Sequence, residues 1–177
     1  MNGREENNMT NIDQLRIRAY HEAGHAVMAY LAGEPVTTYS LNTEDTISSI
    51  PTTSQIFLEF EGEIADPWNY QLRKKIEAKV MIDLAGQIAE EKYIGKTQLP
   101  VYNDDYESVN MLSRIAESEE ELQAYYDWLF IRTEKLISFG INWSLIKVVA
   151  DELFENKELS GPQVIEIIET AQQDYIS

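Results

Sequence analysis

The amino-acid sequence predicts a mainly α-helical fold with one small β element, which places the chain in the α+β class. Apolar residues recur every three or four positions over most of the chain, as they do on the buried face of an α-helix. Two short stretches are instead rich in β-branched and aromatic residues and predict strands. A chain of 177 residues, 44% of them hydrophobic, is long enough to form one domain with its own core.

The N-terminal end predicts a mobile tail over residues 1–10, because this stretch is rich in Asn and Glu and lacks apolar periodicity. Residues 11–177 are then expected to form a single domain. The first helix of this domain should begin just after the tail, where polar capping residues precede the apolar pattern, and end at Gly33.

Two predicted strands follow the first helix. The stretch VTTYSLN, residues 36–42, is β-branched and aromatic, and SQIFLEF, residues 54–60, alternates in the same manner. The polar loop at residues 43–53 separates the two strands, so the β element is expected to be small.

The remainder of the chain predicts helices. Asp66 followed by Pro67 is a helix-start signature, because the Asp side chain caps free amides and proline fits the first turn, and this helix should run to Gly95. Further helical patterns lie at 109–115, after the capping box Ser118–Glu121, after a break at Phe139-Gly140, and after the capping box Ser160–Gln163. No internal repeat or low-complexity linker divides the series.

The composition excludes several classes of function. The chain has 14 Lys and Arg against 31 Asp and Glu, a formal net charge of −17 that repels nucleic-acid phosphates and anionic membrane surfaces. It has no cysteine, which excludes disulfides, thiol nucleophiles and cysteine-ligated zinc. The polar N-terminus is unlike a secretory signal, and no stretch approaches the roughly 18 apolar residues of a membrane span. We therefore expect a cytoplasmic protein without nucleic acid as a partner and without membrane insertion.

The chain contains two histidines, and they lie four residues apart in RAYHEAGHAVMAYLAG, residues 18–33. On a helix, His21 and His25 project from the same face, so their imidazoles can bind one metal ion. Glu22 lies about 100° around the helix from His21, within reach of a water bound to that metal. Gly24, in mid-helix, indicates the close approach of a neighbouring backbone. HEAGH fits the HExxH pattern of zinc-dependent peptidases.

The third metal ligand must be acidic. A catalytic zinc normally takes three protein ligands and leaves the fourth position to water, and this chain has no third histidine and no cysteine. Asp83 and Glu90 lie in the long predicted helix, whereas Asp104 and Asp105 lie at the loop-to-helix junction NDDYES. The residues themselves leave the choice among these carboxylates open.

The sequence resembles the zinc peptidase domain of FtsH, the membrane-anchored AAA protease, over roughly residues 17–168. The most specific part is RAYHEAGHAVMAYLAG, which is similar to the AYHEAGHA helix of that family. DLAGQIAEEKYIG looks like its LAGRAAEE helix, and NDDYESVNMLS resembles the NDL segment that supplies its third zinc ligand. PVTTYSLN looks like the strand after the metal helix, and VVADELFENKELSGPQVIEII like the closing helical pair.

This resemblance implies a Zn²⁺ cofactor held by His21 and His25, with Glu22 as the catalytic general base. For the third ligand, the family pattern places an aspartate seven residues before a Leu that is followed by a small residue. Asp105 fits that register, seven residues before Leu112. A literal match of the ND dipeptide selects Asp104 instead.

The implied function is that of a zinc metalloendopeptidase, a hydrolase that cleaves peptides or unstructured proteins after Glu22 activates a zinc-bound water. The alternative is a catalytically weak or inactive regulatory module that keeps the metal site. The chain departs from the family at the loop QLPVYN, and it lacks a membrane anchor and the G-x-x-x-x-G-K-[ST] segment of an ATPase. We therefore expect a stand-alone peptidase domain whose partners include unfolded substrates and either further copies or a separate ATPase.

Overall fold

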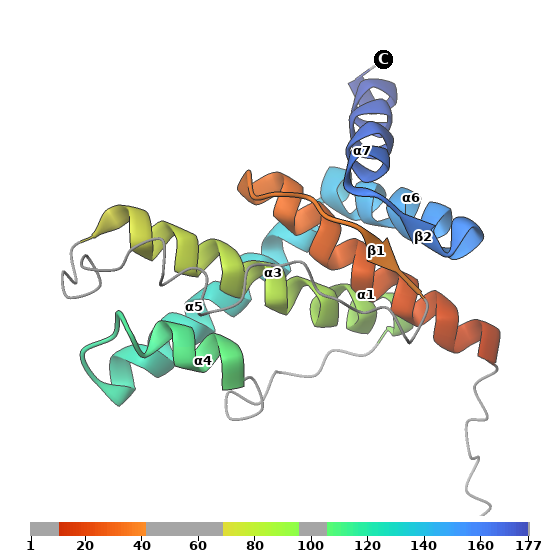
Figure 1. Ribbon diagram of the computed structural model, residues 1–177. Coiled ribbons are helices and arrows are strands. Elements are labelled where there is room, and N and C mark those ends of the chain that lie inside the picture. The colour runs from red at the N-terminus through yellow and green to blue at the C-terminus, as the bar shows by residue number, and fades with distance from the viewer. Residues whose placement is uncertain (1–10, 42–68, 96–105, 177) are drawn as a thin grey trace, which may run out of the picture.

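The computed structural model describes residues 11–41, 69–95 and 106–176. Within these ranges it has six α-helices and one two-stranded antiparallel sheet (Figure 1). The helices are α1 (Asn11–Ala32), α3 (Tyr70–Ile94), α4 (Tyr106–Leu112), α5 (Glu119–Ser138), α6 (Gly140–Asn156) and α7 (Gly161–Ile176), and the strands are β1 (Tyr39–Ser40) and β2 (Glu158–Leu159). The predicted fold class, mainly α with a small β element, is confirmed.

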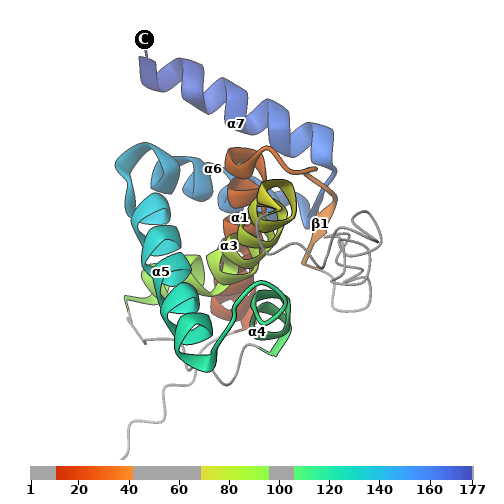
Figure 2. The same cartoon turned by 90° about the vertical axis from the view of Figure 1, so that its left-hand side faces the viewer.

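Helices α1 and α3 lie side by side in opposite directions and form the centre of the structure (Figures 1 and 2). Their contact is the most extensive between any two described elements. Helix α5 packs on α3, α6 packs on α1, and α5 and α6 also contact each other. Helix α7 packs mainly on α6 and extends along one end of the structure (Figure 2).

Small residues allow the two central helices to approach closely. A Cβ atom added at Gly24 of α1 would lie 2.8 Å from the Cβ atom of Ala89 and 2.9 Å from the carbonyl carbon of Ala85, both on α3. No side chain fits at that distance, so the backbones of α1 and α3 are nearly in contact at Gly24. The packing role expected of this mid-helix glycine is confirmed.

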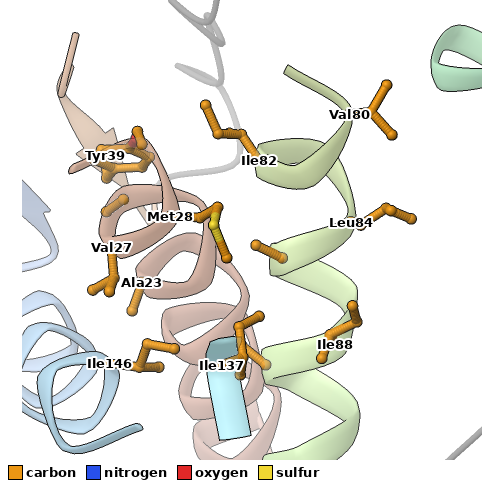
Figure 3. Packing of buried hydrophobic residues seen from close by; sticks show 14 of the residues in the cluster. Ala23, Val27, Met28, Tyr39, Val80, Ile82, Leu84, Ile88, Ile137 and Ile146 are labelled. Atoms are coloured by element: carbon orange, nitrogen blue, oxygen red, sulfur yellow. The ribbon is translucent and has the colours of Figure 1, made fainter. Parts of the chain in front are cut away.

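The core is formed where the central pair meets α5 and α6. Figure 3 shows Met28 of α1, Ile88 of α3, Ile137 of α5 and Ile146 of α6 gathered in one cluster, and all four side chains are buried. Complete burial of one such side chain contributes about 1.5–3 kcal/mol to folding. No helix within the described ranges combines the length and the apolarity that a bilayer-spanning segment needs.

The first predicted strand is shorter than expected. We predicted residues 36–42, but the structure pairs only Tyr39 and Ser40, which lie opposite Leu159 and Glu158 of β2. The reason is the length of the partner: α6 ends at Asn156 and α7 begins at Gly161, which leaves a two-residue strand between them. The second predicted strand, residues 54–60, lies outside the described residues.

The helix boundaries follow local capping chemistry. Helix α3 begins at Tyr70, where the Asn69 side chain accepts a hydrogen bond from the Leu72 amide at 3.0 Å. The predicted start, Asp66-Pro67, lies outside the described residues, and Asn69 is the observed cap.

The capping box ahead of α5 is confirmed on its serine side, because the Ser118 hydroxyl accepts a hydrogen bond from the Glu121 amide at 3.1 Å. The Glu121 carboxylate accepts from the Glu117 amide at 2.7 Å instead of from Ser118. The box ahead of α7 is confirmed on its glutamine side, since Gln163 accepts a hydrogen bond from the Ser160 amide at 2.9 Å. The predicted break at Phe139-Gly140 separates α5 from α6.

Replacement of Gly24 by alanine tests the central contact. The added methyl group must push α1 and α3 apart, which costs about 1–3 kcal/mol and outweighs the gain of up to about 1 kcal/mol from alanine's helix propensity. Urea unfolding should show a loss of stability for Gly24→Ala. Gly140→Ala is the matched control, because a Cβ atom at Gly140 meets no atom within 4 Å and this variant should be neutral or slightly stabilised.

Candidate metal centre

The two histidines of α1 face α3 and converge on one point. Their Nε2 atoms lie 3.0 Å apart, and the two rings meet edge to face with an interplanar angle of 80°. Both residues are partly buried. The convergence follows from the helix itself, because residues four positions apart lie on the same face.

The other ring nitrogen of each histidine faces a hydrogen-bond acceptor on α3. The Nδ1 atom of His21 is 3.1 Å from Oε2 of Glu90, and the Nδ1 atom of His25 is 2.6 Å from the backbone carbonyl oxygen of Ile82. A hydrogen on each Nδ1 satisfies both acceptors. In that tautomer both Nε2 atoms carry free lone pairs, which is the state that ligates a metal.

A glycine of α3 leaves room beside the two Nε2 atoms. A Cβ atom added at Gly86 would lie 2.6 Å from Cε1 of His25 and 2.8 Å from Nε2 of His21. Any larger residue at position 86 would therefore occupy the space between the histidines and α3. One signal of this role lies in the sequence: Gly86 is the glycine of the DLAGQIAEE stretch, one of the stretches on which the family resemblance rests.

The two nitrogens fit a zinc ion. Zinc–nitrogen bonds of about 2.0–2.1 Å in tetrahedral geometry place two nitrogens about 3.3 Å apart, close to the 3.0 Å observed between the Nε2 atoms. Burial, together with the nearby charges of His21 and Lys79, lowers the pKa of His25 to about 4, although the hydrogen bond to Ile82 raises it in part. The His25 ring is therefore neutral at pH 7, as a ligand must be.

Glu22 adjoins this pair from the next position of α1. Its side chain is partly buried. Burial raises the pKa of the Glu22 carboxyl above its ordinary value, while His21 and Arg18 lower it in part. A carboxylate in such surroundings is a better proton acceptor than one in water, which suits a general base.

Two of the four acidic residues considered as third ligand lie within the described residues. Glu90 lies at the Nδ1 atom of His21 and not at Nε2, so its carboxylate is placed to orient the ring. Asp83 forms an ion pair with the buried Lys79. Among the residues that the structure describes, no cluster of three candidate ligands is present. Asp104 and Asp105 lie outside them.

Sequence reasoning missed the partners that α3 supplies. Glu90 was considered only as a ligand. Its hydrogen bond to His21 joins two residues 69 positions apart and depends on how α1 and α3 align. The carbonyl group of Ile82 has no sequence signal, because every residue carries one.

Comparison with known proteins gives a partial similarity. No family model matches the chain. The chain is 33% identical over 95 residues to the ATP-dependent zinc metalloprotease FtsH 3 of Conexibacter woesei. The aligned residues make up 52% of this chain and 12% of that protein, so the chain spans a small part of its relative's length. The similarity is therefore distant and partial, and it is to a zinc metalloprotease.

Proposed function

We propose that this chain is a cytoplasmic zinc-dependent peptidase that hydrolyses peptide bonds in peptides or unstructured proteins. The observation that carries the proposal is the pair of Nε2 atoms, 3.0 Å apart, with the glutamate of the HExxH pattern beside them. Two converging imidazoles and a partly buried carboxylate are the groups that metal-assisted hydrolysis of an amide by an activated water requires.

In this proposal His21, His25 and Asp105 hold the zinc, with Asp104 as the alternative third ligand. Bound there, zinc supplies an acidified water and an electrophile for the substrate carbonyl. Glu22 accepts a proton from the water as its oxygen bonds to the carbonyl carbon. Glu22 then passes that proton to the leaving nitrogen as the carbon–nitrogen bond breaks, so the carboxylate is regenerated.

Glu90 and the Ile82 carbonyl act through the histidines. By accepting hydrogen bonds from the two Nδ1 atoms, they fix the tautomer and the orientation of each ring. The carboxylate of Glu90 also makes His21 a stronger ligand. Gly86 keeps the space beside both Nε2 atoms open.

The relative's name joins zinc proteolysis with ATP dependence, and the alignment covers 12% of that protein. We therefore propose the peptidase chemistry for this chain, with further copies of it or a separate ATPase as partners, and assign energy-dependent unfolding to the ATPase. Zinc binding without peptide hydrolysis would favour the alternative, a regulatory module that keeps the metal site.

Replacement of Glu22 by glutamine tests the general base. Glu22→Gln keeps the size of the side chain and removes the proton acceptor, so hydrolysis of unstructured casein should fall by at least about 10²-fold. Zinc content, measured by elemental analysis, should stay near that of the wild type. Equal turnover by both proteins would contradict the assigned mechanism.

Paired replacements of the two aspartates identify the third ligand. Asp105→Asn should lower the zinc content of purified protein well below one ion per chain, because a neutral amide is a much poorer zinc ligand than a carboxylate. Asp104→Asn should retain zinc. The reverse result would assign Asp104, and full zinc content in both variants would exclude both residues.

Glu90 and its neighbour Glu91 form a matched pair for the supporting hydrogen bond. Glu90→Ala should weaken zinc affinity by about 10–100-fold, because His21 loses the acceptor for its Nδ1 hydrogen. Glu91→Ala should leave zinc affinity unchanged, since Glu91 accepts its hydrogen bond from Gln87 on the exposed surface. Competition titration with a chromophoric chelator measures both. Equal affinity in the two variants would remove the role assigned to Glu90.

A further inference from the structure

Helix α5 carries large apolar side chains on the face that points away from the core. Trp128 is 47% exposed and Ile131 is 52% exposed, and Ala124 on the same face is exposed as well. The opposite face of the helix is buried, and its main contacts are with α3, α4 and α6. Figure 2 shows α5 along one side of the structure. One exposed apolar side chain is ordinary, whereas several on one helix face indicate a contact surface.

The spacing of these residues is that of a seam between two helices. Four positions separate Ala124 from Trp128, three separate Trp128 from Ile131, and Lys135 follows after four more. Alternating spacings of three and four keep a row of side chains on one face, which is the pattern by which two helices pack along their length. Ala124, Trp128 and Ile131 are called the α5 seam below. Arg132 flanks it, with its guanidinium carbon 5.5 Å from the centre of the Trp128 ring.

Charge is distributed unevenly along the same face. The first turn of α5 carries Glu119, Glu120 and Glu121, whereas Arg132 and Lys135 lie in the second half of the helix. Two copies of α5 packed in opposite directions would place the acidic end of each beside the basic end of the other. Packing in the same direction would instead bring like charges together. The charges therefore favour an antiparallel pair.

The two other acidic residues of α5 lie beside the seam and not in it. Asp127 and Glu134 each precede a residue of the row by one position, which turns them about 100° around the helix. Asp127 accepts a hydrogen bond from Gln123 at 2.9 Å, and Glu134 lines a groove between α5 and α3 together with Lys92. Apolar surface therefore makes up the centre of the face.

We infer that the α5 seam binds a second copy of this chain, with the two α5 helices antiparallel about a two-fold axis. A chain of net charge −17 repels its own copies, so they can meet only where opposite charges face each other. The antiparallel arrangement does this at both ends, where Glu120 of each copy lies near Lys135 of the other. Trp128 and Ile131 of both copies are buried between these ends.

The contact is self-complementary, so it closes after two copies. A single pair of helices buries less surface than a permanent interface, which makes the dimer reversible. The inference goes beyond the proposed function, because it depends neither on zinc nor on peptide hydrolysis.

Sedimentation equilibrium of the full chain gives the first test. In about 0.15 M salt, at protein concentrations up to about 0.2 mM, the wild type should show a reversible equilibrium between monomer and dimer. A monomer over the whole concentration range would overturn the inference.

Charge reversal tests the antiparallel arrangement. Lys135→Glu and Glu120→Lys should each raise the dissociation constant of the dimer about tenfold or more, because each brings like charges together. The double variant should return to within about threefold of the wild type. Glu120 is chosen over Glu121, whose carboxylate accepts a hydrogen bond from the Glu117 amide.

Net charge alone predicts a different result for these variants. Glu120→Lys makes the chain less acidic, so a dimer limited by overall repulsion would become tighter and not weaker. Lys147→Glu is the matched control for Lys135→Glu, because Lys147 is exposed on α6. It should leave the dissociation constant nearly unchanged. A double variant no tighter than the single variants would overturn the antiparallel pairing.

Removal of an aromatic ring tests the apolar centre. Trp128→Ala should also raise the dissociation constant about tenfold or more, because an exposed tryptophan is the largest apolar group of the seam. Tyr175→Ala, which removes a 64% exposed ring from α7, should not change it. Urea unfolding checks that each variant is folded. A dimer that Trp128→Ala leaves unchanged would place the contact elsewhere and overturn the inference.

These measurements separate the dimer from the proposed function. A chain that dimerises through α5 but binds no zinc and cleaves no peptide would support this inference and refute the peptidase assignment. A monomeric chain whose peptide hydrolysis depends on Glu22 would support the peptidase assignment and refute the role of the α5 seam.

Discussion

The close contact between α1 and α3 is the constraint on which the rest of the structure depends. At Gly24 the two backbones come so near that no side chain fits between them. Because the helices run in opposite directions, this approach places Glu90 at one histidine and the Ile82 carbonyl at the other. A wider spacing would leave the Nδ1 atoms without acceptors, and the two imidazoles could then turn freely. The packing of small residues between α1 and α3 therefore determines how the rings of His21 and His25 are oriented.

The charged groups around the two histidines are negative on balance. Lys79 and Asp83 form an ion pair on α3, so together they add little net charge near His25. Glu22 and Glu90 remain as the negative groups beside the histidines. A divalent cation between the two imidazoles would meet this net negative charge, which offsets its own charge and so favours its binding.

The features that the sequence predicted correctly are local. Gly33 ends α1 with a φ of 73°, and Ser118 caps α5, because both signals act within one helical turn. The convergence of His21 and His25 was predictable for the same reason. The acceptor at Glu90 and the pairing of Tyr39 with Leu159 join distant parts of the chain, and no single-sequence pattern encodes the register between them. The predicted 36–42 strand was too long because its true partner is a two-residue connection.

The short sheet forms later in a growing chain than the contacts of the histidines do. His21 and His25 leave the ribosome early, and α3 follows with Glu90. Tyr39 has to wait for its strand partner at Leu159 and for Gly161, more than a hundred residues later. Contacts of such high sequence separation close late in folding because the loop entropy must be overcome first. The pairing of the two strands therefore stays incomplete until nearly the whole chain has been synthesised.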